Sequence, residues 1–217
     1  RERLEAHPGQ QAGAAGVPDL GIARERADLQ QALDDAHRKT DARESRVDTV
    51  ERLLSSVRRI DEAGSLSAIL EALVKGAAAE TSRVAVMLVD GEDLKVWGHR
   101  GFAHGAGPTD MPIGASGTLA AAVAVRQSSF VPPLIDGRAH TAPSFMRVPV
   151  GFTGVVIPLV VGGDVVAVLY ADDVDRTEVH EDAPIWTEEV ELLARHASIC
   201  LENVTSVRTV EVLARPG

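Results

Sequence analysis

The sequence is poor in cysteine: its 217 residues include one, Cys200. A single thiol cannot form an intramolecular disulfide, a cysteine-rich zinc cluster or a two-thiol redox centre. A chain of this length buries roughly 70% of its unfolded surface on folding, so it needs no such cross-link for stability. We therefore expect a protein of a reducing compartment and predict a cytoplasmic location.

Long uninterrupted apolar runs are also missing. The longest runs from Val155 to Ala171 and is broken by Gly162-Gly163-Asp164, so it cannot span a bilayer as one helix. No basic segment followed by an apolar one opens the sequence, and we expect neither a secretory leader nor a membrane partner. The first residue is Arg1, and we expect the chain to be part of a longer protein.

Positive charge is not in excess, because the net charge is −10. Residues 1–60 carry 11 Lys and Arg against 11 Asp and Glu, so the whole imbalance lies in residues 61–217, which carry 11 against 21. An acidic body does not condense onto a phosphate backbone. We therefore predict that the chain has no nucleic-acid partner.

Proline and glycine are absent between Ile22 and Ile60, where charges of both signs alternate. Counting back from Val57 in steps of three and four, eight of the eleven positions are apolar. This spacing is the heptad seam of a coiled coil over about five repeats. The predicted dimer interface consists of Leu29, Leu33, Val47, Val50, Leu54 and Val57.

The charges beside this seam favour a parallel homodimer. With Val47 at heptad position a, Lys39 faces Glu44 of the partner and Arg46 faces Glu51, and both pairs are attractive. The alternative is one long amphipathic helix packed on its own domain. The sequence thus predicts three regions, namely a flexible linker over 1–20, a coiled-coil dimerisation helix over 21–60, and a globular domain over 61–217 that includes a C-terminal helix.

The globular region alternates between helical and strand patterns. The expected elements are a helix capped by Ser65, strands over 84–89 and 94–99, a short extended piece at 111–113, a helix after Ser116, a short strand over 128–131, a hairpin of 155–161 with 165–171, and a helix from Thr187. Residues 132–150 contain four prolines and are expected to form a loop that is a lid, a binding loop or disordered. This order predicts an α+β domain in which helices lie on an antiparallel sheet.

Four segments occur in an order and spacing that carry a resemblance. They are Ser82–Val89 after its helix, Pro112-Ile113-Gly114-Ala115-Ser116-Gly117, the hairpin Val156–Tyr170, and Trp186–Leu193. Together they resemble the GAF domain, the small-molecule sensing module of signalling proteins, over about residues 65–204. The hairpin is close to the family pattern PL…G…GVL.L, with Ala167 where glycine is usual.

The resemblance implies a GAF-like (profilin/PAS-like) antiparallel sheet with helices on both faces. It also implies a ligand pocket between the sheet, the middle helix and the long loop, and flanking helices that dimerise and signal to a further domain or partner protein. The cyclic-nucleotide signature of the family is not visible after Tyr170. Cys200 falls on the last helix, away from the pocket, and the reductase branch uses several cysteines, so we expect no covalent chromophore, no cofactor and no enzymatic activity.

The few aromatic residues are the candidates for contacting a small organic ligand. The predicted ligand-binding residues are Trp97, His99, Phe102, Phe130, His140, Phe145 and Tyr170, and Arg100, Arg138 and Arg147 are candidates for an anionic group. The alternative is that the aromatic side chains are simply core. We predict no metal site from His99, His104 and His140, and no catalytic group from Ser116, Asp136 and His140, because their spacing matches no motif.

The acidic run that starts at Asp172 and Asp173 lacks the glycine of a calcium loop and is expected to be solvated.

Two functions remain from the sequence. In the first, the chain is a regulatory sensor that binds a small ligand beneath the 132–150 loop and transmits a change through its dimerising helices. In the second, the interior is filled by its own side chains, and the domain is a dimerising, partner-binding scaffold. An open cavity of about 300 Å³ or more lined by Trp97, Phe102 and Phe145 favours the sensor.

Overall fold

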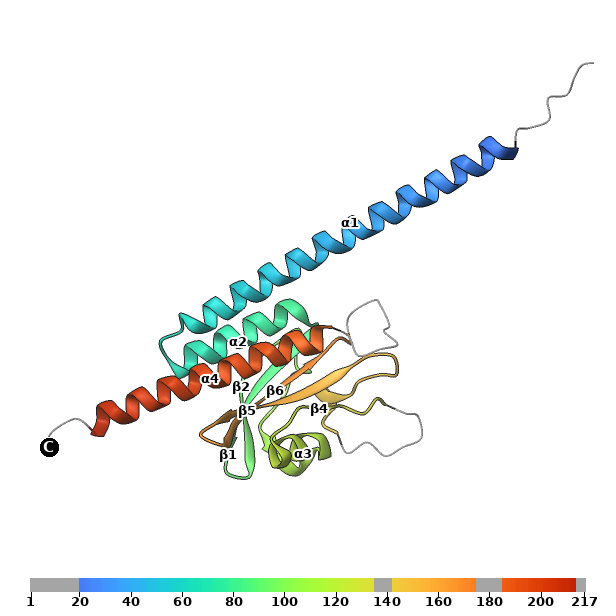
Figure 1. The fold of residues 1–217 in the computed structure, drawn as a ribbon. Helices are drawn as coiled ribbons and strands as arrows, with labels where there is room; N and C mark the ends of the chain where they lie inside the picture. The colour runs from blue at the N-terminus through green and yellow to red at the C-terminus, as the bar shows by residue number, and fades with distance from the viewer. Residues whose placement is uncertain (1–19, 135–141, 175–184, 214–217) are drawn as a thin grey trace, which may run out of the picture. The chain divides into compact units, whose positions relative to one another are not determined.

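The computed structural model describes residues 20–134, 142–174 and 185–213. The chain divides into two compact units, Arg1–Asp48 and Thr49–Gly217. The helix expected over 22–60 is confirmed as α1 (Leu20–Asp61) (Figure 1). The second unit therefore begins inside α1, about a dozen residues before the boundary at residue 61 that the sequence predicts. The predicted linker lies almost wholly outside the described residues.

The apolar seam of α1 is largely solvent-exposed within the chain. Leu29, Leu33, Val47, Val50 and Leu54 are between 48% and 65% exposed. The last member of the seam, Val57, differs because it is half-buried against the core of the second unit. Pairing of this seam with a second copy remains a prediction. If it occurs, Val57 would contact both the core of its own chain and the partner helix.

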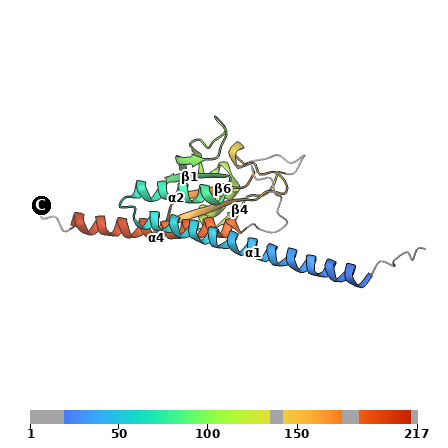
Figure 2. The same ribbon diagram turned by 90° about the horizontal axis from the view of Figure 1, so that it is seen from above.

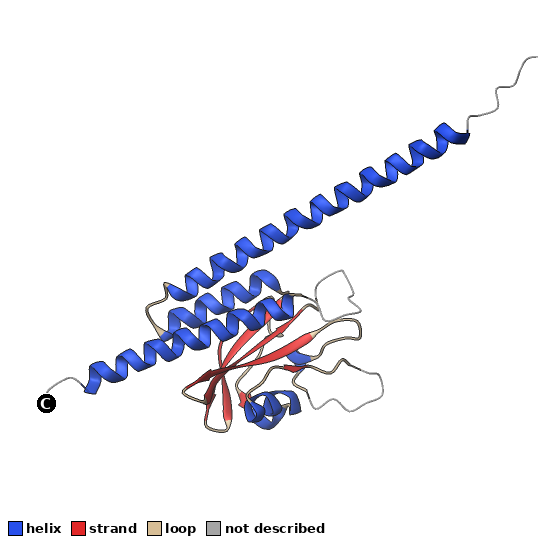
Figure 3. Cartoon of the chain, viewed as in Figure 1, coloured by secondary structure: helices blue, strands red, loops and turns tan. Residues whose placement is uncertain are grey.

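The sheet contains six strands in the order β3-β2-β1-β6-β5-β4, and every neighbouring pair is antiparallel (Figure 3). The strands are β1 (Arg83–Asp90), β2 (Asp93–Arg100), β3 (Met111–Pro112), β4 (Ser129–Phe130), β5 (Gly154–Val161) and β6 (Asp164–Asp172). The predicted α+β class, with helices on both faces of an antiparallel sheet, is confirmed. The hairpin β5–β6 turns at Gly162 and Gly163, whose φ values of 60° and 89° suit residues without a Cβ.

One face of the sheet carries the longer helices, and we refer to it as the helix face. It is covered by α2 (Leu66–Glu80) and α4 (Trp186–Leu213), which lie side by side in both ribbon views (Figures 1 and 2). The Ser65 hydroxyl accepts a hydrogen bond from the Ala68 amide at 3.2 Å and caps α2, as predicted. The core beneath these helices is aliphatic, with Ile69, Leu73 and Leu193 fully buried.

The opposite face is closed by shorter pieces, and we refer to it as the loop face. It is covered by α3 (Gly117–Val125), the 3₁₀ turn η1 (Ile113–Ala115) and a second 3₁₀ turn, η2 (Ser144–Met146). Phe145 and Met146 of η2 and the following Val148 are buried in the core of this face. These three residues of the predicted 132–150 loop therefore form part of the core, and residues 135–141 lie outside the described residues.

The short strand β4 pairs with only the first part of β5, through Ser129↔Val156 and Phe130↔Val155. Further along this edge, Pro158 has no amide hydrogen to offer. The Val160 amide donates to the Ser198 hydroxyl of α4 at 3.3 Å.

Among the described helices, none is both long and apolar enough to cross a membrane.

Candidate functional site

An aromatic cluster occupies the loop face. Phe102 follows β2, Phe145 lies in η2 and Tyr170 lies on β6, and their ring centroids are 5.3 to 6.5 Å apart. His99 of β2 adds an edge contact to Phe102 at 5.6 Å. Phe145 and Tyr170 are buried and Phe102 is half-buried, so the rings fill the interior between the sheet and η2.

A glycine aims Phe102 into this cluster. Gly101 adopts a φ of +82°, and a Cβ at this position would lie 1.9 Å from the Ser82 carbonyl oxygen. The backbone of β2 therefore turns tightly against the segment before β1, a path that only glycine permits. The turn delivers the ring of Phe102 over the sheet beside Tyr170.

An ion pair between Arg83 and Asp172 lies beside the aromatic cluster. The β1–β6 register places Arg83 opposite Asp172, and the guanidinium binds both carboxylate oxygens, with Nε to Oδ1 at 2.8 Å and Nη2 to Oδ2 at 2.7 Å. The Tyr170 hydroxyl and the Val174 amide also donate to this carboxylate. The guanidinium lies 5.2 Å from the centroid of Phe102, so it joins the polar network to the rings.

The protonation of this network follows from its burial. Burial raises the pKa of the Asp172 carboxyl above its ordinary value, whereas the hydrogen bonds and charge of Arg83 and the hydroxyl of Tyr170 oppose that rise. Burial and the neighbouring Asp172 raise the pKa of Tyr170 far above that of an exposed phenol. Tyr170 therefore remains protonated and donating, and the network is a fixed support for the rings.

The next residue ties three elements together. The Asp173 carboxylate accepts from the Thr153 amide at 2.7 Å and from the Trp186 indole at 3.2 Å. It therefore joins the segment before β5 to the first residue of α4. The expectation that the acidic run is solvated is wrong for Asp172 and Asp173, which are 0% and 1% exposed. They are buried because each satisfies its oxygens with protein donors.

Sequence spacing contained one signal that could have identified Asp172. It directly follows the uninterrupted apolar run Ala167–Ala171, which indicates that it continues the strand, and it is the last residue of β6. Once β1 and β6 are paired, the register places Arg83 opposite it. That pairing, however, joins residues 89 positions apart in the chain, and nothing local in the sequence shows it.

The structure brings four of the predicted ligand-binding residues together, His99, Phe102, Phe145 and Tyr170. It places Trp97 elsewhere, since a bulge in the β1–β2 register sets Val86 against Gly98 but Met87 against Val96. The extra residue turns Trp97 toward α2, where it borders a surface hollow of about 450 Å³ with Glu71, Val74, Gly98, His99 and Arg100.

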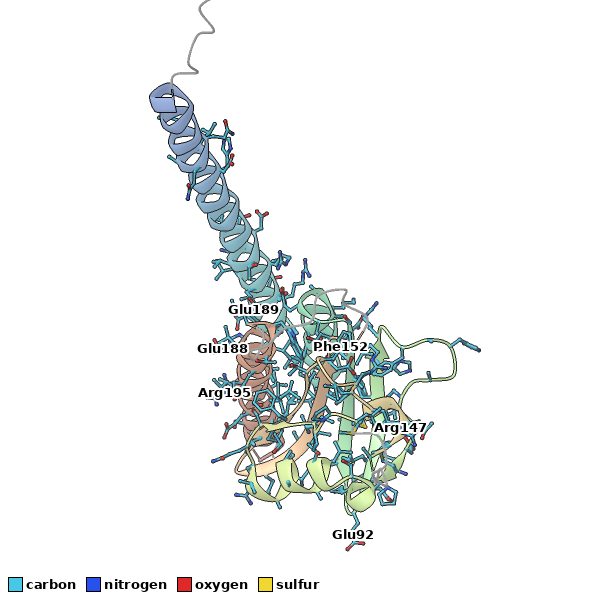
Figure 4. All side chains as sticks on the ribbon, turned by 90° about the vertical axis from the view of Figure 1, so that its right-hand side faces the viewer. Glu92, Arg147, Phe152, Glu188, Glu189 and Arg195 are labelled. Atoms are coloured by element: carbon cyan, nitrogen blue, oxygen red, sulfur yellow. The ribbon has the colours of Figure 1, made fainter. Side chains whose placement is uncertain are left out.

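Phe130 also lies apart from the cluster. Its strand neighbour Val131 is buried on the loop face, so alternation along β4 points Phe130 the other way. It is 59% exposed and lines a groove of about 670 Å³ between β5 and α4, with Ile199 and Arg195 on the helix side. Figure 4 shows Arg195 on the outer side of α4. His140, Arg138 and Asp136 lie outside the described residues.

The fold is that of a GAF domain. The GAF domain of a phosphoenolpyruvate-protein phosphotransferase from Coxiella burnetii matches with a TM-score of 0.55 at 14% identity, covering 74% of this chain and 96% of that one. A solved fragment of a methyl-accepting chemotaxis protein, comprising residues 122 to 287 of that protein, matches with a TM-score of 0.53 at 17% identity, covering 70% of this chain and 98% of that one.

An enzyme shares the same fold. Free methionine-R-sulfoxide reductase from Neisseria meningitidis, solved in complex with its substrate, matches with a TM-score of 0.52 at 18% identity, covering 71% of this chain and 89% of that one. No family model matches the chain, and no curated protein matches it. The likeness establishes the GAF fold, which regulatory domains and at least one enzyme use.

Proposed function

We propose that the chain is a regulatory sensor module of a signalling protein, which dimerises through α1 and responds to a small ligand at the loop face. The GAF fold, also found in a chemotaxis protein and a phosphotransferase, supports the regulatory role. The observation that carries the ligand proposal is the aromatic cluster over the Arg83–Asp172 pair. It combines ring faces for stacking with a charged group beside them.

In this proposal a ligand enters the site by displacing a ring, because Phe145 and Tyr170 are buried in contact with each other. Phe145 is the ring that we propose moves, because it lies in a short 3₁₀ turn and not in a strand of the sheet. Movement of η2 exposes Phe102 and Tyr170 to a flat organic molecule, and His99 lies at the edge of the same space. We propose these four as the ligand-contacting residues.

The alternative function is a ligand-free scaffold that only dimerises and binds partners. The burial of Phe145 and Tyr170, at 3% and 0% exposed, favours it, because their mutual contact fills the interior. In addition, neither the hollow of about 450 Å³ beside Trp97 nor the groove of about 670 Å³ beside Phe130 is lined by Phe102 or Phe145. The two functions differ in whether a small molecule stays with the purified protein.

Native mass spectrometry of the purified chain tests both parts of the proposal at once. A sensor is expected to have the mass of two chains plus a small molecule that leaves on denaturation. Two chains without added mass support the scaffold, even when candidate compounds are supplied. A single chain contradicts dimerisation.

Substitution of two seam residues tests the dimer directly. Val50→Lys together with Leu54→Lys is expected to give monomers in sedimentation, since both side chains are about half exposed in one chain and would place like charges in the paired seam. The control is Asp48→Lys, an exposed position outside the seam, which should leave the dimer intact. An unchanged dimer mass in the double variant would refute the coiled-coil interface.

We also propose that the module is not an enzyme. The reductase with this fold acts on free methionine sulfoxide, a reaction that depends on several cysteines in that branch, whereas this chain has Cys200 alone. Incubation with free methionine-R-sulfoxide and a thiol reductant is expected to yield no methionine above the protein-free rate. Turnover that disappears in Cys200→Ser would overturn this assignment.

A further inference from the structure

Three side chains of different chemistry converge outside the site described above. Asp61 is the last residue of α1, and His196 and Cys200 lie one turn apart on α4. His196 Nε2 is 2.7 Å from Asp61 Oδ1, and Cys200 Sγ is 3.7 Å from that oxygen and 3.8 Å from that nitrogen. All three residues belong to the unit that begins at Thr49.

The atoms involved distinguish a ligand triangle from a catalytic relay. In a nucleophile–histidine–acid relay, the two ring nitrogens have separate partners, one bonding to the acid and the other to the nucleophile. In this cluster, the same nitrogen, Nε2 of His196, faces both the Asp61 oxygen and the Cys200 sulfur. The three donor atoms therefore point toward one another around a single place.

The size of the triangle fits a metal ion. A point equidistant from the three atoms lies about 2.0 Å from each, close to the bond lengths of about 2.0–2.1 Å for zinc to nitrogen and about 2.3 Å for zinc to sulfur. A small outward shift of the ion and a modest widening of the nitrogen–oxygen pair complete tetrahedral geometry. The side chains have room for this, because Asp61 is 54% and His196 26% exposed.

We propose that Asp61, His196 and Cys200 form a binding site for a divalent transition-metal ion of the zinc type. Imidazole and thiolate donors select such ions over magnesium and calcium, which require oxygen ligands. One carboxylate and one thiolate supply two negative charges against the charge of the ion. Three protein ligands leave a fourth position for water or another small ligand.

Sequence spacing alone could not identify this site. His196 and Cys200 have the i, i+4 spacing that puts two ligands on one helix face, but the third ligand lies 135 residues from His196. An ion at this place fastens the end of α1 to the middle of α4. Leu192 and Ile199, next to His196 on α4, are more than half exposed, so the site borders the apolar surface of that helix.

Titration with Co²⁺ under reducing, chelator-free conditions tests the site. Tetrahedral cobalt bound to a thiolate absorbs by charge transfer in the near ultraviolet, and we expect one equivalent per chain, displaced by Zn²⁺. Cys200→Ser should abolish the absorption. Asp61→Asn and His196→Ala should each weaken binding by roughly 100-fold or more, beyond the 10–100-fold that loss of an outer-shell partner costs. His104→Ala, an exposed histidine elsewhere, is the matched control.

Two further measurements make the result independent of any one variant. Zn²⁺ should raise the melting temperature of the wild-type protein and slow alkylation of Cys200 by iodoacetamide, and neither effect should occur in Asp61→Asn. If His196→Ala fails to fold, His196→Gln replaces it. Wild-type protein without the cobalt absorption, or variants at Asp61 and His196 that bind cobalt as tightly as the wild type, would overturn the proposal.

Discussion

The two faces of the sheet are closed in different ways. The helix face is covered by two regular helices over an aliphatic core, whereas the loop face is covered by one short helix and irregular segments over aromatic rings and a buried ion pair. Regular helices carry their own hydrogen bonds, so that face depends mainly on apolar contact. The loop face depends on a few specific contacts, among them the Arg83–Asp172 ion pair, whose side chains are 14% and 0% exposed.

This difference assigns separate tasks to the faces. An aliphatic interface between helices resists local opening, because its many contacts are lost together. A short turn such as η2 is able to move with less loss, because it is joined to the domain by irregular chain. Under the proposed function, the helix face would hold the dimerising helix and the loop face would respond to the ligand.

The largest expected effect comes from the ion pair of the loop face. Arg83→Gln leaves Asp172, which is fully buried, without its cation and should lower the free energy of unfolding by about 3–5 kcal/mol at pH 7. Asp172→Asn should cost less, since the Arg83 guanidinium that it leaves is 14% exposed to solvent, whereas Asp172 is fully buried. Arg147→Gln, at an exposed arginine (Figure 4), is the control and should stay within about 0.5 kcal/mol.

The pH dependence of Arg83→Gln gives an independent check. Arg83 lowers the pKa of Asp172 against the effect of burial, so its removal raises that pKa further. A carboxyl with a higher pKa in the folded than in the unfolded state binds its proton more tightly when folded. The stability deficit should be complete above the folded pKa and should shrink as pH falls toward about 4. Urea denaturation at pH 7 and pH 4.5 measures it, and a deficit that grows toward low pH contradicts this account.

A matched pair of leucines compares the two faces with the same chemistry. Leu73 of α2 and Leu119 of α3 are both 0% exposed. Leu73→Ala should cost near the upper end of the roughly 2–5 kcal/mol range, because rigid helices hold the cavity open. Leu119→Ala should fall near the lower end, because the loop face can collapse. Equal costs in chemical denaturation would show that both faces are equally rigid.

The smallest expected effects on stability come from alanine substitutions at two glycines. A Cβ at Gly154 would lie 2.8 Å from Val148 Cγ2 on the loop face, and we expect Gly154→Ala to cost about 1–3 kcal/mol. A Cβ at Gly76 of α2 would lie 3.0 Å from Ser56 Cβ. Gly76→Ala regains up to about 1 kcal/mol of helix propensity, which offsets this crowding. Thermal unfolding should therefore rank Gly154→Ala as the more damaging change.

Most of the fold could be predicted because its elements are periodic. The seam of α2, the buried run of β1 and the Gly162-Gly163 turn all follow local rules, and each element was found close to its predicted position. The burial of Phe145 and Met146 could not be predicted, since η2 has no repeating pattern. Its burial depends on the space left between α3 and the sheet.

The candidate site was only partly predictable for a related reason. Tyr170, Phe102 and Phe145 meet as the sequence predicts, but Trp97 does not join them, because a one-residue bulge reverses the face on which it lies. The buried role of Asp172 depends on strand register, and the Asp61–His196–Cys200 cluster depends on packing between distant helices. The sequence places Asp172 after an apolar run and puts His196 and Cys200 on one helix face, but it does not show that Arg83 pairs with the first or that Asp61 meets the other two.

The open end of strand β5 has a consequence for how the protein behaves in a crowded solution. Pro158 removes one outward donor and Ser198 occupies the next, at Val160. An incoming extended peptide would therefore find no regular ladder to join along this border. This edge of the sheet is therefore expected to resist fibre-like stacking, and the proposed self-association would use the seam of α1 instead.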